Sequence, residues 1–561
     1  MKYKISKQTS DTEQSVYIYE DHEKKVPLNS LYSPEKEALR FINKLNNVEK
    51  KFVIFIGFGN GTLLDMLVED GIFDRNVHFL FIEPFSEIKL SDKHFSLISK
   101  IEKLSYHNLN NFNSIVFAKF ISKFTSIPVD IKIHPNYSKV NQSLIKDCLK
   151  IIHEGIETKQ ILNNTELKFA VDWIVEPLIN IEHIPKSVNL KKLQGKFKGE
   201  RAVLIASGPS LKTHIDFIKK GQDSFHLFAV GSALRALMEN EIHPDYVLSV
   251  DASDRNYETH FEGIQYKGTL IYETMSNSNI QKHHQGTLVV SQALSDYVTS
   301  QIFNDLYSFP QMSPSVAIYT LQVIAYLGFS EVYLVGQDLA LVNGEYYAKG
   351  IKHHDGMKGL KAELLVENNE GEKVGTTKAL KIFLESFESI IKILPKELKI
   401  YNLSKQGAKI EGTTYISLNE VSPYSKRMIS FNKDTLQLSS STHSIINNFL
   451  DKFDKLRMEV GQASKSLNRM IQSGVVSPDD MIKVVKKFRN ITKHEILEEV
   501  ILSKLTFMFD TIINKFAYFE EKQKYTNDDL LQLVKELSTF YKLISTYIDD
   551  ILNDERLSKY K

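Results

Sequence analysis

One segment, which has the pattern of a strand, a glycine turn and a helix, constrains the fold of this chain more than any other. Residues 202–206 form an apolar run of strand length, and residues 209–219 carry apolar side chains at helical spacing. Between them lies the turn Ser207-Gly208-Pro209-Ser210. In an open α/β sheet such a turn lies at the carboxyl edge, where the free N–H groups of the helix can bind a phosphate. The segment predicts either a nucleotide-binding turn or an ordinary strand-to-helix connection with capping.

Each residue of this turn suits both interpretations. Gly208 permits a positive φ and a close approach of the backbone to a ligand. Pro209 fits the first helical position, where no N–H is needed, and Ser207 and Ser210 add hydroxyl groups.

The region after Arg201 alternates between strand and helix patterns. Helices are expected at 209–219, 232–239 and 315–327. The expected strands are 202–206, 226–230, 246–250, 269–272, 287–290 and 331–335. This alternation predicts a mostly parallel sheet that is covered on both faces.

Polar and small residues follow several of these strands directly. Because the carboxyl ends of parallel strands meet at one edge, we expect these residues to converge where open α/β sheets bind ligands. They are Gly231, Ser232, Asp251, Ser253, Asp254, Glu273, Gly336, Gln337 and Asp338.

A second glycine cluster lies near the N-terminus. Gly57, Gly59 and Gly61 follow an apolar strand, and the next strand, 77–82, ends in Glu83. In methyltransferases such an acidic residue holds the ribose of the methyl donor. The spacing is not the dinucleotide fingerprint, however, and the glycines could serve only to let strand and helix pack. We expect a Rossmann-like domain in which this cluster is structural.

Composition limits the classes of partner and compartment. The chain has 70 Lys and Arg against 69 Asp and Glu, a net charge of +1, which gives no support for a nucleic-acid partner. A single cysteine, Cys148, excludes an intramolecular disulfide. The N-terminal residues have no signal-peptide pattern, and no apolar run approaches membrane-spanning length. We expect a cytoplasmic protein with no membrane span.

The chain order predicts four parts. A Rossmann-like α/β domain covers 1–135, a helical bridge 136–195, and the central α/β domain 196–425. Beyond about 430 glycine and proline become rare and helical periodicity dominates, so 426–561 is expected to be all helical.

A series of short motifs in the central part resembles the motility-associated-factor (Maf) family of flagellin glycosyltransferases, whose central domain is MptE-like. The motifs occur in family order, and the resemblance covers roughly 165–420. They are Ala206-Ser-Gly-Pro-Ser-Leu211, Ala229-Val-Gly-Ser-Ala233, Pro244-Asp-Tyr-Val-Leu-Ser-Val-Asp251, Ser313-Pro-Ser-Val-Ala317, Leu327-Gly-Phe329, Tyr333-Leu-Val-Gly-Gln-Asp-Leu339, Tyr347-Ala-Lys-Gly350 and Asn402-Leu-Ser-Lys-Gln-Gly-Ala-Lys-Ile-Glu-Gly412.

The resemblance implies a cytoplasmic transferase that acts on flagellin. It would move a nonulosonic acid, of the pseudaminic or legionaminic type, from its CMP-activated form to Ser or Thr of flagellin. The implied central fold is Rossmann-like, sialyltransferase-like and GT-A-type. One departure is Pro314, which stands where glycine is common in the family and removes a backbone N–H from that turn.

Such a transfer needs a cradle for CMP, a base for the acceptor hydroxyl and a clamp for the leaving phosphate. Asp251 is the first choice for the base or for a ribose contact, and His354 is the second choice for the base. Ser315 could equally be a plain N-cap. The nucleotide-binding candidates are Ser207, Gly208, Pro209, Ser210, Gly231, Ser232, Ser313, Ser315, Gln337 and Asp338.

The sequence requires no cofactor and predicts no metal ligand set, although Mg²⁺ is compatible with it. The first alternative is a Mg²⁺-dependent pyrophosphokinase of the hydroxymethylpterin type, which would bind the metal ion through Asp251, Asp254 and Asp338. The second alternative is a non-catalytic flagellin-binding factor in which the helical part does the work.

Overall fold

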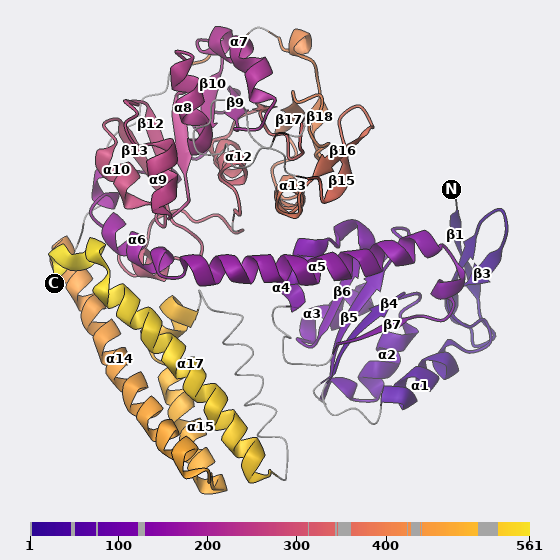
Figure 1. Ribbon diagram of the computed structural model, residues 1–561. Helices are drawn as coiled ribbons and strands as arrows, with labels where there is room; N and C mark the ends of the chain where they lie inside the picture. Colours follow the sequence, from indigo (N-terminus) through magenta and orange to yellow (C-terminus); the bar gives the residue numbers. More distant parts are fainter. Residues whose placement is uncertain are drawn as a thin grey trace. The chain divides into compact units, whose positions relative to one another are not determined.

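The computed structural model of the chain (Figure 1) describes residues 3–45, 51–74, 77–121, 129–311, 313–342, 345, 361–422, 424–427, 438, 440–502 and 525–561. Two compact units are present, one formed by residues 3–163 and the other by the described residues from 164 onward. The boundary falls inside helix α5 (Gln142–Phe169). The four-part division given above stays a prediction.

The first unit contains a Rossmann-like sheet preceded by a small antiparallel meander. The meander consists of β1 (Lys4–Thr9), β2 (Ser15–Glu20) and β3 (Lys25–Pro27). The parallel sheet has the order β6-β5-β4-β7. Its strands are β4 (Lys51–Ile56), β5 (Val77–Glu83), β6 (Leu104–Asn108) and β7 (Val129–Ile133).

Apolar side chains of this sheet alternate between two cores, so both faces are covered. One core includes Phe52 and Ile54, and the other includes Val53 and Phe55. The helices of the unit are α1 (Pro34–Leu45), α2 (Thr62–Glu69), α3 (Asp92–Lys100), α4 (Ser114–Ile121) and the first part of α5. The N-terminal Rossmann-like fold expected from the sequence is therefore present.

The second unit is built on a nine-stranded sheet in which every recorded strand pair is parallel. The order is β18-β17-β14-β9-β10-β11-β12-β13-β8. The strands are β8 (Val188–Asn189), β9 (Arg201–Ile205), β10 (His226–Val230), β11 (Tyr246–Ser249), β12 (Thr269–Glu273), β13 (Thr287–Ser291), β14 (Glu331–Val335), β17 (Lys399–Asn402) and β18 (Thr414–Tyr415).

The predicted mixed α/β fold class is confirmed, and the predicted strands match these ranges within one residue at each end. The strands form apolar runs because both faces of the sheet are covered by helices. Those in the α/β part are α6 (Asp172–Asn180), α7 (Leu211–Gly221), α8 (Gly231–Glu239), α9 (Asp254–His260), α10 (Ser278–His283), α11 (Tyr297–Ser300), α12 (Val316–Leu327) and α13 (Lys378–Ile391).

The order of the strands creates a topological switch point beside β9. From β9 the chain proceeds outward through β10 to β13, and it then returns through α12 to β14 on the other side of β9. Because parallel crossovers are right-handed, α7 and α12 cover opposite faces of the sheet. Ligands of open α/β sheets bind outside the carboxyl ends of the strands at such a point, here the ends of β9 and β14.

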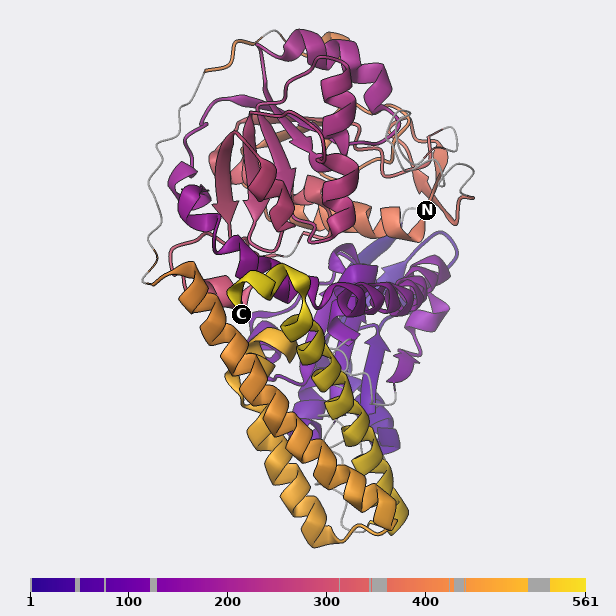
Figure 2. The same cartoon turned by 60° about the vertical axis from the view of Figure 1, so that its left-hand side comes forward.

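The C-terminal part of the second unit is helical, as the periodicity predicted. Helices α14 (Thr442–Ser473) and α17 (Asn527–Asn553) lie side by side, and both views show this (Figures 1 and 2). Between them in the chain come α15 (Pro478–Thr492) and the π-helix η9 (Ile496–Ile501), and the 3-10 helix η11 (Glu555–Tyr560) follows α17. A further hairpin pairs β15 (Leu364–Glu367) with β16 (Lys373–Thr376).

Candidate functional site

The turns that follow β9 and β14 interlock at the switch point. The amide of Ala206 donates to the carbonyl of Val335, and the amide of Gly208 donates to the carbonyl of Gly336, each at 2.8 Å. A Cβ atom on Gly208 would lie 2.4 Å from the Gly336 oxygen. The close approach of these two backbones is what requires glycine at 208, since its φ is not positive.

Asp338, which was expected to contact a nucleotide, instead supports the first turn. Its side chain is buried, and one carboxylate oxygen accepts the amide of Ser210 at 2.7 Å. The other oxygen accepts the hydroxyl of Ser404, and the Asp338 carbonyl accepts the amide of Ala408 at 2.6 Å. Because protein groups engage both carboxylate oxygens, Asp338 fixes the turn and presents no free carboxylate to a ligand.

Helix α7 begins two residues later than predicted, and Pro209 lies in the turn before it and not at the first helical position. The reason is the geometry of the turn: the amide of Ser210 is directed to Asp338, and the amide of Leu211 returns to the carbonyl of Gly208 at 3.0 Å. Ser210 occupies the N-cap position, but its hydroxyl makes no capping hydrogen bond.

Within the described residues, two buried polar atoms in the turns after β9 and β14 have no hydrogen-bond partner. They are the hydroxyl oxygen of Ser210 and the amide oxygen Oε1 of Gln337, whose side chain is 5% exposed. Leaving such an atom unpaired costs about 1–3 kcal/mol. An orphaned polar atom in a native structure usually marks a bound water, an ion or a ligand, so these two atoms favour a ligand site beside the turn.

The end of β10 joins the same site through small residues. The hydroxyl groups of Ser207 and Ser232 share a hydrogen bond of 2.8 Å, which ties the turn after β9 to the start of α8. Gly231 packs against Phe261, whose ring would lie 2.7 Å from a Cβ at that position. Helix α8 has no side-chain N-cap, so its first amides are open to an anion.

Ser313 and Ser315 both have protein partners near the start of α12. The side-chain amide of Gln322 donates to the Ser313 hydroxyl at 2.6 Å, and the Ser315 hydroxyl accepts the amide of Ala317 at 3.2 Å. Ser315 is thus the N-cap of α12, the plainer of the two roles left open by the sequence. Because α12 runs antiparallel to the strands, its N-terminus lies at their carboxyl edge.

Asp251 is exposed just beyond β11. One of its carboxylate oxygens accepts the amide of Ser253 at 2.8 Å, and its carbonyl accepts the amide of Asn277 at 3.0 Å, which joins the ends of β11 and β12. Asp254 instead accepts the side-chain amide of Asn277 at 2.9 Å. Within the described residues no group of three or more metal-ligating side chains gathers.

Glu273, the last residue of β12, lies at this edge, as expected from the sequence, although it was not assigned a role in catalysis or binding. Its side chain is partly exposed and makes no hydrogen bond to the part of the chain that the structure describes. Burial, with a smaller contribution from the neighbouring Asp296, raises the pKa of Glu273 to about 8. An acid ending an otherwise apolar strand, Thr-Leu-Ile-Tyr-Glu, was the signal that could have identified it.

Helix α6 supports the loop after β12. The side-chain amide of Asn180 donates to the carbonyls of Thr274 and Ser276 at 2.9 and 2.7 Å. Glu176 is buried, accepts the amide of Ser278 at 2.6 Å and pairs with Arg556 at 2.8 Å. Burial raises the pKa of Glu176 to about 7 in spite of these partners. Arg556 thus helps, through Glu176, to position the loop that follows β12.

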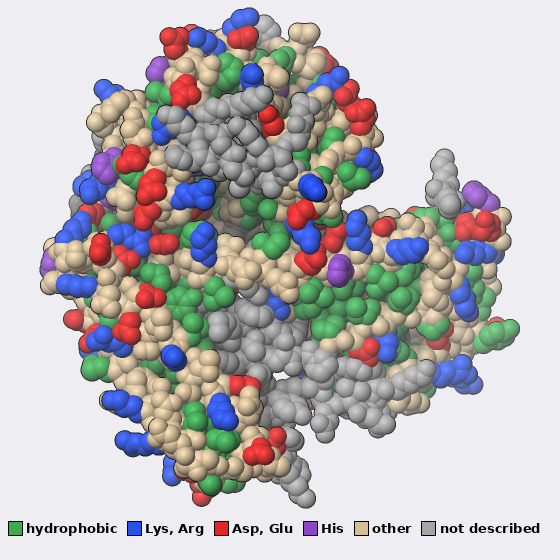
Figure 3. Space-filling view, viewed as in Figure 1, with side chains coloured by type: hydrophobic (Ala, Val, Ile, Leu, Met, Phe, Trp, Pro, Cys, Tyr) green, Lys and Arg blue, Asp and Glu red, His purple; other side chains and the backbone are tan. Residues whose placement is uncertain are grey.

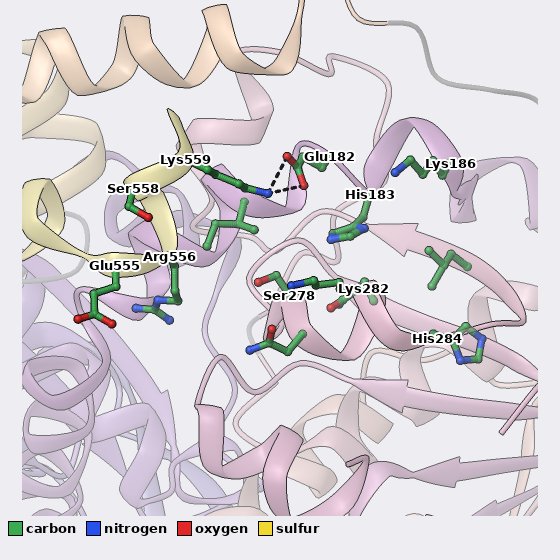
Figure 4. Close-up of a pocket in the computed structure, with 14 residues that line it drawn as sticks. Glu182, His183, Lys186, Ser278, Lys282, His284, Glu555, Arg556, Ser558 and Lys559 are labelled. Atoms are coloured by element: carbon green, nitrogen blue, oxygen red, sulfur yellow. Dashed lines mark hydrogen bonds and ion pairs between the residues drawn. The ribbon is translucent and has the colours of Figure 1, made fainter. Parts of the chain in front are cut away.

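A pocket of about 540 Å³ lies between α6, α10 and η11 (Figure 4). Lys559 bridges to Glu182 across it at 2.9 Å, and Arg556 is paired with carboxylates. His183 is buried there, and burial, followed by the charge of Lys186, lowers its pKa to about 4. Ion pairs occupy much of this pocket, and none of the predicted site residues lines it.

The N-terminal glycine turn, in contrast, is filled by the protein itself. Glu83 is buried and accepts the amides of Phe58, Gly59 and Phe85 at 2.9–3.1 Å. The hydroxyl of Tyr137 donates to the same carboxylate at 2.7 Å. Burial, the largest effect, raises the pKa of Glu83 to about 7. The carboxylate that holds a ribose in methyltransferases here closes the turn, in keeping with the structural role expected for this cluster.

Three further predictions concern residues or properties away from this sheet edge. His354, with His353 and Asp355, lies outside the described residues. Among the described helices, none is long and apolar enough to cross a bilayer. On the face seen in Figure 3, basic and acidic side chains are interspersed, in keeping with the near-neutral net charge.

Comparisons with known proteins bear on the same region. Residues 176–344 match the family described as 6-hydroxymethylpterin diphosphokinase MptE-like. An uncharacterized protein of Treponema pallidum (strain Nichols) is 25% identical over 105 residues, which are 19% of this chain and about half, 49%, of that relative.

A solved structure is similar along nearly the whole chain. The MAf glycosyltransferase from Magnetospirillum magneticum AMB-1 aligns with a TM-score of 0.50 and 13% identity, over 98% of this chain and 93% of that one. At this identity the likeness establishes the fold. Residues 176–344 therefore form an MptE-like domain in a chain with the fold of a MAf glycosyltransferase, which confirms the family resemblance inferred from the motifs.

Proposed function

We propose that this protein is a glycosyltransferase that moves a nonulosonic acid, of the pseudaminic or legionaminic type, from its CMP-activated form to Ser or Thr of flagellin in the cytoplasm. The carrying observation is a pair of buried atoms at the switch point of the MptE-like domain, Ser210 Oγ and Gln337 Oε1, which have no partner among the described residues. The MAf-like fold of the whole chain supports the transfer of a sugar.

The chemistry of this edge suits a nucleotide phosphate. The uncapped start of α8 offers backbone amides and the positive end of a helix dipole. Ser207 and Ser232 add hydroxyl groups next to it. The start of α7 is less available, because Asp338 already occupies the amide of Ser210. We therefore expect the donor phosphate nearer to α8 than to α7.

A direct displacement with inversion of the anomeric centre fits the available groups. A covalent route needs an activated nucleophile, and burial instead raises the pKa of Cys148 to about 12. Asp251, exposed at the edge, is proposed to act as base or to fix the nucleotide. His354 is the alternative base. The leaving phosphate is proposed to lie against hydroxyl groups and helix N-termini, so the proposal does not require a metal ion.

The test is to express the protein together with flagellin and a nonulosonate pathway in one cell and to measure the intact mass of flagellin by mass spectrometry. Wild type should add sugar-sized increments, and Asp251→Asn should lose them, because loss of a general base costs ~10²–10⁴ in rate. Asp223→Asn, an exposed acid beyond α7, is the matched control and should glycosylate normally. Normal glycosylation by both Asp251→Asn and His354→Ala would reject the assigned chemistry.

A second function is favoured by the description of the matching family, a hydroxymethylpterin diphosphokinase. Such an enzyme would transfer diphosphate from ATP with Mg²⁺, for which Asp251 and Asp254 are the candidate ligands. Incubation of the purified protein with ATP, Mg²⁺ and hydroxymethylpterin decides between them: AMP release that depends on the pterin would support the kinase and displace the glycosyltransferase. The remaining alternative, a flagellin-binding factor without activity, predicts flagellin capture with no mass change.

A further inference from the structure

Glu273 differs from Glu176 and Asp338, two buried carboxylates of the second unit. Glu176 is paired with Arg556, and both oxygens of Asp338 accept protein hydrogen bonds. Glu273 makes no hydrogen bond within the described residues, and its carboxylate oxygens are not among the fully buried, unpartnered atoms. The carboxyl group therefore lies in a recess that solvent, or a small hydroxyl group, can still reach.

The neighbours of Glu273 come from two other elements. Asp296, after β13, is buried and caps α11 by accepting the amide of Thr299 at 3.1 Å. The Tyr319 hydroxyl, from α12, shares a hydrogen bond of 2.7 Å with Ser291, the residue that pairs with Glu273 across the sheet. Asp251 follows the adjacent strand β11 at the same edge.

We infer that Glu273 takes the proton from the acceptor hydroxyl in the transfer and that Asp251 contacts the donor nucleotide; the inference rests on the proposed function. Glu273 is at the carboxyl edge, is partly exposed and has no side-chain hydrogen bond within the described residues, whereas Asp251 already accepts the amide of Ser253. A carboxyl group held in a recess without a salt bridge is typical of acid–base catalysts.

The step balances as a single displacement. The acceptor oxygen forms a bond to the anomeric carbon while the bond from that carbon to the phosphate oxygen breaks. The bonding electron pair leaves with CMP, and the hydroxyl proton moves to the Glu273 carboxylate, which later returns it to solvent. No oxidant, reductant or further reactant is needed.

The pH dependence follows from the groups that face Glu273. The like charge of Asp296 adds to burial in raising the pKa of Glu273 to about 8, and among the described residues no cation is recorded as opposing it. The Tyr319 hydroxyl titrates far above this range. The rate of wild type should therefore rise with pH and level off above about pH 8, where the base is ionised.

The experiment uses the purified full-length protein, flagellin and a CMP-activated nonulosonic acid, with CMP release followed across the pH range. Glu273→Gln should lower the rate by ~10²–10⁴ and leave the affinity for CMP, measured by calorimetry, unchanged. Asp296→Asn keeps an N-cap side chain and removes the charge, so the rising limb of its pH profile should move to lower pH. Glu258→Gln, an exposed acid on α9, is the matched control.

The outcomes separate this inference from the proposed function. Turnover by wild type together with turnover near the wild-type rate by Glu273→Gln would overturn the role of Glu273 alone, as would an unmoved pH limb in Asp296→Asn. Loss of CMP affinity in Glu273→Gln would make it a binding residue and also overturn the inference. A wild type that binds the donor and releases no CMP would contradict the proposed function, and the role of Glu273 with it.

Discussion

The chain contains two glycine turns in equivalent places of their sheets. They differ in the side chains that surround them. In each unit the turn follows the strand at the switch point, β4 in the first and β9 in the second. The strand beside β4 ends in Glu83, whose carboxylate accepts three backbone amides. The strand beside β9 is followed by Gly231, which packs against Phe261, and by Ser232, whose hydroxyl group pairs with that of Ser207.

The difference teaches that the glycines do not decide whether such a turn binds a ligand. In the first unit the Glu83 carboxylate supplies the negative charge that a ligand would otherwise bring. It accepts the backbone amides of the turn, so these amides are already satisfied. In the second unit Asp338 satisfies one amide, while Ser210 Oγ and Gln337 Oε1 find no partner in the part of the chain that the structure describes. The residue at the end of the neighbouring strand is therefore the better indicator of function.

The largest expected effect comes from adding a side chain to each turn. Gly208→Val would place Cβ within 2.4 Å of the Gly336 oxygen and should abolish CMP binding in calorimetry. Gly59→Val, where φ is +61° and Cβ would lie 2.2 Å from Asn29, should destabilise the first unit by about 1–3 kcal/mol. CMP binding by Gly59→Val should equal wild type.

Circular dichroism and thermal unfolding of both variants serve as the control for folding. CMP binding by Gly208→Val at the wild-type affinity would break the comparison, because the second turn would then be as structural as the first. A loss of CMP binding in Gly59→Val would also contradict the comparison, because the first turn would then contribute to CMP binding.

The next effect is the pH dependence of the first unit. The pKa of Glu83 is about 7 when folded and about 4.5 when unfolded. Between these values the folded state binds more protons, so the free energy of unfolding should fall as pH rises through this window, by an amount on the order of 3 kcal/mol. Glu83→Gln carries no charge and should lack this dependence.

Hydrogen exchange of the β4 amides, measured at several pH values, reports this unit alone. Protection that stays constant with pH in wild type, or that falls equally in Glu83→Gln, would show that Glu83 does not titrate in this window. Binding of S-adenosylmethionine that depends on Glu83 would show that the turn is a ligand site after all.

Local pattern was sufficient to predict the elements of the fold. The apolar run 202–206 and the periodicity of 315–327 can be recognised from neighbouring residues, and both elements are present within one residue of the predicted bounds. The start of α7 was wrong because Asp338, 128 residues away in sequence, captures the amide of Ser210. A contact at that separation leaves no local signature.

The candidate site, too, could be predicted only as far as local sequence pattern allows. Strand ends identified Ser207, Ser232 and Asp251 as candidates, since any parallel sheet gathers its strand ends at one edge. The sequence could not separate Glu83, enclosed by donors, from Glu273, whose side chain has no donor among the described residues, because both simply end apolar strands. That distinction depends on what fills the space beside each carboxylate.

The smallest and sharpest test removes one hydroxyl group from each turn. Ser210→Ala deletes a buried atom that has no partner in the described ranges, so the free energy of unfolding should stay within about 0.5 kcal/mol of wild type or rise. Affinity for CMP should fall by about 1 kcal/mol, because a ligand atom loses its hydrogen bond. Thr62→Ala is the matched change, since the Thr62 hydroxyl donates to Gln14 at 2.8 Å. It should cost about 1 kcal/mol of stability and nothing in CMP affinity. If Ser210→Ala lowers stability and spares CMP binding, its hydroxyl serves the fold, and the two turns are more alike than their geometry indicates.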